Sequence, residues 1–144
     1  MTQQAPPPVT PPIPQPESDF YWEKCKEHEL WLRHCKACDN TYFYPRDICP
    51  NCFSRNTEWI QCSGKGTLHT FGVVVRPPHR AWTEEVPFVV AMVDLEEGCR
   101  MPTNLVQTDV DPGNPGEKIQ VGMAVEVVWE ERTDKITLPM FKPA

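Results

Sequence analysis

The amino-acid sequence predicts a mainly β protein, in which a short N-terminal helix and a cysteine-rich ribbon precede a small closed barrel. Two observations lead to this prediction. Four cysteines stand in two C-x-x-C pairs, and beyond residue 56 short runs of alternating apolar and polar residues are separated by glycine and proline. At 144 residues the chain is long enough for one ordinary domain or two very small ones.

The N-terminal segment is rich in proline: residues 1–16 hold seven of the 17 prolines. Proline fixes φ and removes a backbone donor, so we expect a flexible, extended tail, or a strap that lies on a partner. The N-terminus lacks the basic start and apolar core of a signal peptide, and no apolar stretch is long enough to span a membrane. A cytoplasmic location is therefore expected, where clustered cysteines bind metal more often than they form disulfides.

Residues 17–29 are predicted to form a short helix that begins with Ser18 or Asp19 as the cap. Cys25 and His28 lie on nearly one face of this helix. These two side chains are potential metal ligands, but a face that packs on a sheet is the better interpretation.

The cysteine pairs predict a metal site formed by Cys35, Cys38, Cys49 and Cys52. The spacing of two residues in each pair lets both sulfurs reach one metal, and four thiolates favour zinc, or iron of the rubredoxin kind. A closed shell of four cysteines leaves no position for water, so the predicted role of the zinc is structural. A redox dithiol is the alternative, which the presence of two pairs disfavours. His34 is expected at the surface or supporting a ligand.

After residue 56 the pattern becomes that of half-buried antiparallel strands. The alternation is clearest at Val89, Ala91 and Val93, which are separated by Val90 and Met92. The strand-like runs are residues 57–76, 86–95, 100–108, 124–131 and 135–141. Five strands in this length suit a small closed or nearly closed barrel. The expected division of the chain is a tail at 1–16, the helix and ribbon at 17–56 and the barrel at 57–144.

Several motifs follow one another in a characteristic order. They are Phe20-Tyr21-Trp22-Glu23, Leu30 to Cys35, Pro45-Arg46, Cys49-Pro50, Gly64 to Phe71, Pro87 to Gly98, Val121 to Val127 and Leu138 to Phe141. This order closely resembles a family, once labelled a domain of unknown function, with a rubredoxin-like zinc ribbon followed by an OB-fold. The resemblance covers about residues 17–142 and implies an OB-fold barrel.

Members of that family are accessory proteins of acyl-CoA metabolism that bind thiolase-superfamily enzymes. These partners include thiolases, hydroxymethylglutaryl-CoA synthases and lipid-transfer-protein-like aldolases of steroid side-chain breakdown. The resemblance therefore implies a non-catalytic subunit that supports a thiolase or a retro-aldol aldolase acting on acyl-CoA thioesters. If the partner is a dimer, its symmetry presents the same patch twice, so we expect a two-plus-two assembly. Fused members carry a hydratase-like domain, so this chain is expected to be a stand-alone subunit or a piece of a fusion.

Two other functions are compatible with parts of the sequence. A single-stranded nucleic-acid-binding OB-fold is the alternative, but residues 57–144 hold eight Lys or Arg against 13 Asp or Glu, where a basic groove is needed. A small enzyme that uses Cys62 or Cys99 is the third hypothesis, although packed apolar thiols are the plainer interpretation. The adjacent pairs Glu84-Glu85 and Glu96-Glu97 are interpreted as solvated turns.

The segment from Arg76 to Thr83 joins two predicted strands and carries the candidate contact residues Arg76, His79, Arg80 and Trp82. Trp22 is a further candidate. Tryptophan and arginine dominate protein interfaces, and arginine pairs with phosphates, so the segment is either a plain loop or a site of contact with a partner or with CoA.

Overall fold

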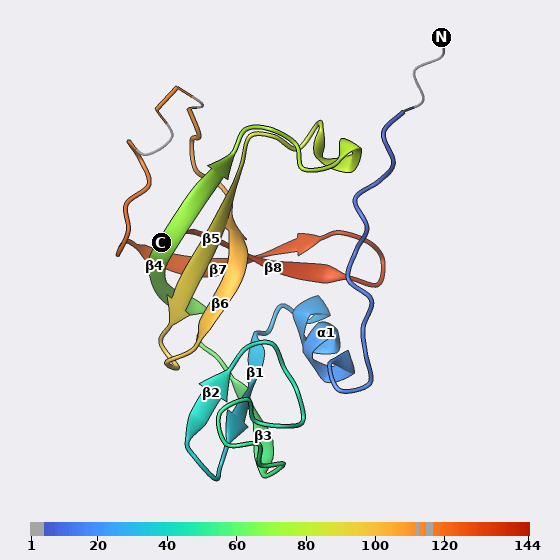
Figure 1. The fold of residues 1–144 in the computed structure, drawn as a ribbon, viewed down its shortest axis with the longest axis vertical. Coiled ribbons are helices and arrows are strands. Elements are labelled where there is room, and N and C mark those ends of the chain that lie inside the picture. The colour runs from blue at the N-terminus through green and yellow to red at the C-terminus, as the bar shows by residue number, and fades with distance from the viewer. Residues whose placement is uncertain (1–4, 112, 115–116) are drawn as a thin grey trace.

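The computed structural model describes residues 5–111, 113–114 and 117–144. Figure 1 shows a small sheet at one end, a barrel at the other and the helix α1 (Asp19–Lys26) between them. The small sheet has the strand order β2 (Asn40–Tyr42), β1 (Trp31–Cys35), β3 (Thr57–Gln61). The closed barrel has the order β4 (Lys65–Val74), β5 (Phe88–Leu95), β6 (Arg100–Leu105), β8 (Thr137–Pro143), β7 (Ala124–Glu131). The prediction of a mainly β fold with a five-stranded OB-type barrel is confirmed.

The helix α1 is shorter than the predicted span of residues 17–29. Ser18 is its N-cap residue, but the Ser18 hydroxyl makes no cap hydrogen bond. Instead, it donates to the carbonyl oxygen of Gln15 at 3.2 Å and accepts from the Gln15 N–H at 3.0 Å. The hydroxyl therefore stabilises the turn between tail and helix. At the other end, His28 has a φ of 62°, a left-handed conformation in which the helix does not continue.

One face of α1 packs into the interior. Tyr21, Trp22 and Cys25 are 1%, 7% and 0% exposed. The opposite side carries Phe20, whose ring lies 4.8 Å from the ring of Trp59. The helix therefore has two contacts, one with the barrel and one with the ribbon sheet, and joins these two small units.

The run of residues 57–76, predicted as one barrel strand, forms two strands in different sheets. β3 pairs with β1 from Trp31↔Gln61 to Cys35↔Thr57, and so completes the ribbon sheet. β4 begins only at Lys65. Gly64 lies between them with a φ of 75°, and a Cβ at Gly64 would lie 2.4 Å from Val127 Cγ1. The chain therefore passes from ribbon to barrel at residues 62–64, a break that the continuous β-like composition conceals.

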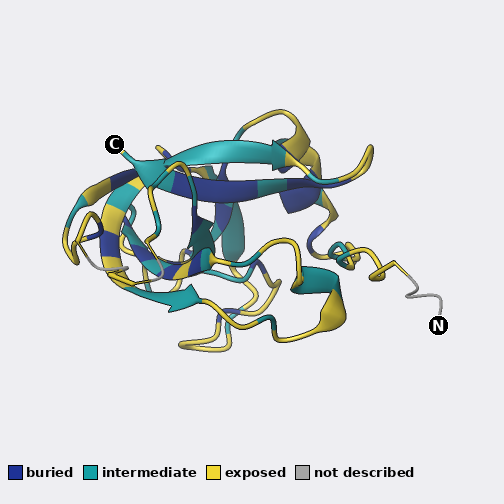
Figure 2. Cartoon of the chain, turned by 90° about the horizontal axis from the view of Figure 1, so that it is seen from above, coloured by how far each residue is buried: buried dark blue, intermediate teal, exposed yellow. Residues whose placement is uncertain are grey.

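The barrel strands show the predicted alternation. On β5, Val89, Ala91, Val93 and Leu95 are 1%, 5%, 0% and 4% exposed, whereas Val90 between them is 43% exposed. Figure 2 shows buried and less buried positions following one another around the barrel. Because successive side chains point to opposite faces of a strand, this pattern places one set in the core and the other on the outer surface.

The long strand β4 closes the barrel because it pairs on both sides. Lys65 to Thr67 pair with β7, and most of the strand pairs with β5. The pairing register between β4 and β5 shifts between Leu68 and Thr70 of β4. Such a bulge bends the strand and increases its twist. This bend is what a small barrel needs in a strand shared by both of its halves.

The closure between β6 and β8 is narrow: these parallel strands pair only at Leu105↔Phe141 within the described residues. Beside this seam, Tyr21 and Trp22 of α1 share a small apolar crevice with Met101, Leu138 and Met140. The helix therefore covers the seam. Among the described residues, no helix is long and apolar enough to cross a membrane.

Candidate metal centre and interaction surfaces

The four predicted metal ligands come together at the tip of the ribbon. Their Sγ atoms all lie within 4.8 Å of one another. The Cys35–Cys52 and Cys38–Cys49 sulfur pairs are each 3.6 Å apart. A tetrahedron with metal–sulfur bonds of about 2.3 Å has edges of about 3.8 Å. The arrangement therefore fits a tetrahedral metal with four thiolate ligands.

The two cysteine pairs sit in similar turns. The residue after each second cysteine, Asp39 or Phe53, has a positive φ, 57° and 61° respectively. Sequence reasoning did not identify the amides that support the sulfurs: Asn51 Nδ2 donates to Cys38 Sγ at 3.5 Å, and Asn40 Nδ2 lies 3.9 Å from Cys49 Sγ. Such donors stabilise negative charge on sulfur.

The site also favours thiolate at Cys49. Burial raises the pKa of this thiol, but hydrogen bonds from the backbone N–H groups of Cys52 and Asn51, together with the neighbouring thiols, outweigh burial and lower the pKa. At Cys52 the shift is opposite: a backbone hydrogen bond from Ser54 lowers the pKa, but burial and the neighbouring thiols outweigh it and raise the pKa, so one cysteine of the site ionises more readily than another. A thiolate is the form that binds metal. His34 does not compete as a ligand, because its Nδ1 lies 2.9 Å from Thr41 Oγ1 and its Nε2 lies 3.0 Å from Asp39 Oδ1.

Trp22, a candidate for partner contact, lies in the interior. Its indole is 7% exposed and Nε1 donates to the hydroxyl of Tyr44 at 3.1 Å. This buried position gives Trp22 a packing role between helix and barrel. The sequence signal for this role is helical spacing: Trp22 and Cys25 lie three residues apart and so share the buried face of the helix with Tyr21.

The other candidates stay together in the β4–β5 loop (residues 75–87), which contains the short 3-10 helix η1 (Arg80–Trp82). Arg76, His79 and Arg80 are exposed. His79 Nδ1 accepts from the Ala81 N–H at 3.2 Å, which caps η1. Trp82 is half-buried, with its ring 5.0 Å from that of Phe88. The basic side chains of the loop are therefore exposed to solvent, whereas Trp82 packs against Phe88 of the barrel strand β5.

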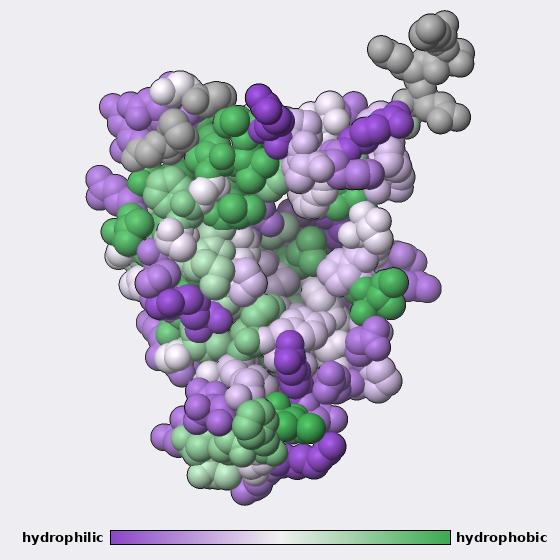
Figure 3. Space-filling view, viewed as in Figure 1, coloured by the Kyte–Doolittle hydropathy of each residue, from purple (hydrophilic) through white to green (hydrophobic). Residues whose placement is uncertain are grey.

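The outer face of the barrel is aliphatic where β4, β5 and β6 lie side by side. A shallow hollow of about 260 Å³ there is lined by Thr70, Gly72, Val90, Met92 and Pro102, among others. Figure 3, in the view of Figure 1, shows apolar surface over β4 and β5. Phe71 also lines this hollow, which has no charged side chain among its lining residues, so the face offers apolar contact to a partner and few groups for phosphate binding.

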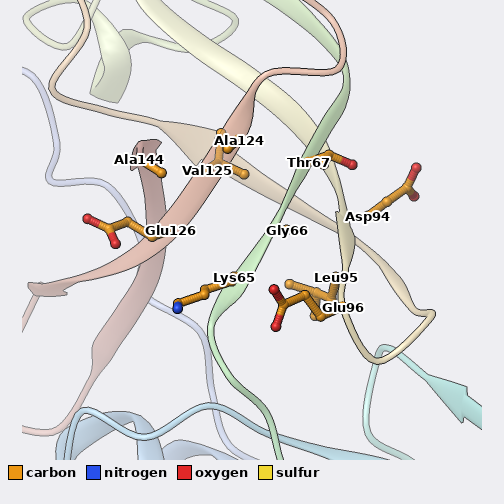
Figure 4. A pocket seen from close by; sticks show the side chains of 10 residues that line it. All are labelled: Lys65, Gly66, Thr67, Asp94, Leu95, Glu96, Ala124, Val125, Glu126 and Ala144. Carbon is orange, nitrogen blue, oxygen red and sulfur yellow. The ribbon is translucent and has the colours of Figure 1, made fainter.

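A second hollow, of about 550 Å³, lies where β4 meets β5 and β7. Its three carboxylates do not converge: in Figure 4, Glu126 lies across β4 from Asp94 and Glu96, and the side chains of Asp94 and Glu96 point apart. Asp94 and Glu126 are also engaged elsewhere, because Asp94 accepts from Arg100 Nε at 2.6 Å and Glu126 pairs with Lys142 at 3.1 Å. The hollow therefore offers no paired carboxylates for general acid–base chemistry.

The thiols outside the metal site are not activated. Burial raises the pKa of Cys62 to about 12 and that of Cys99 to about 11. Burial likewise raises the pKa of Cys25 to about 12. A nucleophilic cysteine needs a lowered pKa, so these three side chains are packing groups rather than catalytic ones.

The comparisons with known proteins agree with this architecture. Residues 22–58 match the model of the ChsH2 rubredoxin-like zinc ribbon domain, and residues 59–130 match the ChsH2 C-terminal OB-fold domain. A "DUF35 domain-containing scaffold protein" of Methanocaldococcus jannaschii is 38% identical over 111 residues, which are 75% of this chain and 73% of that protein. The chain belongs to this family of zinc-ribbon and OB-fold proteins.

Longer relatives and a solved complex extend the comparison. A "probable enoyl-CoA hydratase alpha subunit" of Thermomonospora curvata is 36% identical over 144 residues, and this chain spans 43% of its length. A "3-oxo-4,17-pregnadiene-20-carboxyl-CoA hydratase alpha subunit" of Mycobacterium tuberculosis is 29% identical, and the chain spans 35% of it. A chain of the solved "Ltp2-ChsH2(DUF35) aldolase" has a TM-score of 0.75 and 34% identity, with 92% of this chain and 98% of that chain covered.

Proposed function

We propose that this protein is a non-catalytic accessory subunit that binds and supports a thiolase-superfamily enzyme, a thiolase or a retro-aldol aldolase, acting on acyl-CoA thioesters. The observation that carries the proposal is the likeness to a chain of a solved aldolase, which extends over 98% of that chain. This chain and the chain of the solved aldolase therefore share both the ribbon and the barrel, rather than a single domain. The name of the Mycobacterium tuberculosis relative favours steroid side-chain thioesters as substrates of the complex.

In this proposal Cys35, Cys38, Cys49 and Cys52 hold one structural zinc. The ion would cross-link the two cysteine turns and supply folding energy to a ribbon too small for a core of its own. Four protein ligands leave no position for substrate, so the zinc takes no part in the chemistry. The catalytic groups then belong to the partner enzyme.

The alternative of a single-stranded nucleic-acid-binding protein has less support. OB-folds that bind nucleic acid use the outer face of strands two and three together with neighbouring loops. Here these strands are β5 and β6, and their outer face carries Val90, Met92 and Pro102. Aliphatic side chains on an acidic barrel suit a protein surface better than a phosphate backbone.

The exposed basic side chains Arg76, His79 and Arg80 are the proposed contacts of the β4–β5 loop. They would meet either the partner enzyme or the phosphates of its CoA substrate, since guanidinium groups bind phosphate well. Replacing Arg76 and Arg80 by Gln tests this choice: a changed KM for acyl-CoA with an intact complex indicates CoA contact, and a weakened complex indicates partner contact.

The accessory function is tested by expressing a thiolase-superfamily enzyme encoded in the same genome, alone and together with this chain. We expect the enzyme alone to be insoluble or weakly active, the pair to form a stable complex that makes or breaks carbon–carbon bonds, and this chain alone to turn over no acyl-CoA. Full activity of the enzyme alone, or turnover by this chain alone, would contradict the proposal.

A further inference from the structure

The N-terminal strap, defined here as residues 6–11, lies against one edge of the barrel. Together with the β4–β5 loop and the β7–β8 turn (residues 132–136), it lines a groove of about 590 Å³. Figure 1 shows the strap running past both of these loops. Val9 and Pro11 are half-buried there. Binding clefts in proteins typically measure about 300–1,000 Å³, so this groove is large enough to receive a segment of another molecule.

The chain beyond the strap is anchored by a turn at residues 15–18. Ser18 is fully buried, and its N–H donates to the carbonyl oxygen of Gln15 at 2.8 Å. One residue earlier, Glu17 Oε2 accepts from the backbone N–H of Asp47 at 3.2 Å, a contact with the ribbon. The strap is therefore tethered to the folded body a few residues beyond its own end, and its prolines restrict the conformations available to it along the barrel edge.

The loop side of the groove is acidic. Glu84 and Glu85 line it, and the one cation among its described lining residues is Arg132. Arg132 already forms ion pairs within the protein: its Nη2 lies 2.8 Å from Glu130 Oε1 and its Nη1 lies 3.8 Å from Glu85 Oε1. Glu84 is exposed and has no ion pair within the described part of the chain. The groove thus combines uncharged proline rings on one side with an uncompensated carboxylate on the other.

We propose that this groove is where the enzyme subunit docks, and that its occupant is a protruding segment of that enzyme with a lysine or arginine beside an apolar side chain. The inference rests on the accessory function proposed above and names the surface that carries it. Proline rings lose little conformational entropy when they are covered, so the strap can bind the apolar side chain at low cost. The cation would pair with Glu84, as charge complementarity across interfaces requires.

The test measures the affinity of the complete chain for an Ltp2-type aldolase subunit from the same genome. Glu84→Lys reverses the free charge of the groove without breaking an ion pair seen in the structure. Glu96→Lys is the matched control, because Glu96 is an exposed carboxylate on the β5–β6 turn, at the other end of the barrel in Figure 1. In a second variant, residues 6–11 are replaced by a Gly-Ser segment of equal length. Zinc content and thermal unfolding verify that each variant is folded.

We expect Glu84→Lys and the strap replacement each to raise the Kd by about tenfold or more, with Glu96→Lys near wild type. The two effects should be less than additive in the combined variant, because both variants weaken contact with one segment. Replacing a single exposed lysine or arginine of the enzyme by Glu should restore binding to Glu84→Lys. If both variants bind the enzyme with unchanged affinity, the groove is not the docking site, and the proposed accessory function still stands. If the wild-type chain forms no complex with the enzyme, both the docking site and the accessory function are wrong.

Discussion

At the scale of the residue, the cysteine site is a geometric match rather than a loose cluster. Cys35 and Cys49 are fully buried, while Cys52 is exposed. Two of the sulfurs are thus shielded inside the ribbon, and one lies at its surface. A tetrahedral metal held by all four cysteines would have no open position for substrate, whatever the exposure of the individual ligands.

We therefore expect Cys49→Ser to lose the metal and to unfold the ribbon, because zinc binding supplies about 10–16 kcal/mol to units of this kind. The zinc content should fall from about one ion per chain to well below one, as measured by elemental analysis. Circular dichroism should show a loss of structure. Cys62→Ala is the control, since Cys62 is buried outside the site and its removal should leave the zinc in place. Wild-type protein that carries well under one metal per chain would contradict the structural zinc.

The buried thiols lead to a second expectation at this scale. Because burial raises the pKa of Cys25 and Cys62 to about 12, the thiolate fraction at pH 8 is about a thousandfold below that of an ordinary cysteine. In zinc-loaded protein these residues should resist iodoacetamide at pH 8 and react fully in urea, as followed by mass spectrometry of peptides. Rapid labelling of Cys62 or Cys99 in the folded state would reopen the hypothesis of a thiol enzyme.

At the scale of the element, β4 depends on close backbone contact. Gly66 pairs with Leu95 of β5, and a Cβ at Gly66 would lie 2.4 Å from the carbonyl oxygen of Asp94 and 2.8 Å from Val93 Cγ1. A backbone oxygen cannot move aside as a flexible side chain does. The close approach of β4 and β5 near the bulge therefore requires glycine at this position.

We expect Gly66→Ala to lower the free energy of unfolding by about 1–3 kcal/mol, the usual cost of overpacking. Gly72→Ala on the same strand is the matched control: its Cβ would lie 3.7 Å from Val90 Cγ2, an ordinary contact, and the change should be near neutral. Urea unfolding of the two variants measures the difference. Equal stabilities would show that the strands separate more easily than the structure indicates.

At the scale of the whole molecule, two small units are joined by one helix and held as a single scaffold. The face of α1 that carries Tyr21 and Trp22 closes the barrel seam, while Phe20 packs on the ribbon. Leu30 and Leu32 of the ribbon also belong to the same hydrophobic core as the barrel, so the groove, the β4–β5 loop and the aliphatic face of β5 and β6 are presented by one packed body. Such a body suits a subunit that acts by positioning and supporting another protein.

A two-plus-two assembly is the expected state of the complex with a dimeric enzyme. The two subunits of a symmetric dimer present the same patch twice, so each binds one copy of this chain. Mass photometry or native mass spectrometry of the co-purified complex should give the mass of two enzyme subunits and two copies of the 16.5 kDa chain. A complex with a single copy of this chain on an enzyme dimer would be inconsistent with two equivalent docking patches.

The sequence by itself determined the features that depend on local spacing and periodicity. The two C-x-x-C pairs identified the sulfurs that meet in space, and the alternation along Val89 to Leu95 predicted which side chains fill the barrel. The family follows from the order of these motifs. Ligand spacing and period-two alternation are visible in sequence because they are imposed by the metal and by the strand itself.

Only the tertiary structure decided which segments meet over long distances. It assigned β3 to the ribbon and β4 to the barrel, where sequence composition is continuous, because a strand's partner is set by the rest of the fold. It buried Trp22, which sequence reasoning had offered as a surface residue. It also brought the strap, Glu84 and the β7–β8 turn together in one groove, although Glu84 lies more than 70 residues after the strap. Such contacts arise from barrel closure and helix docking, which no local pattern encodes.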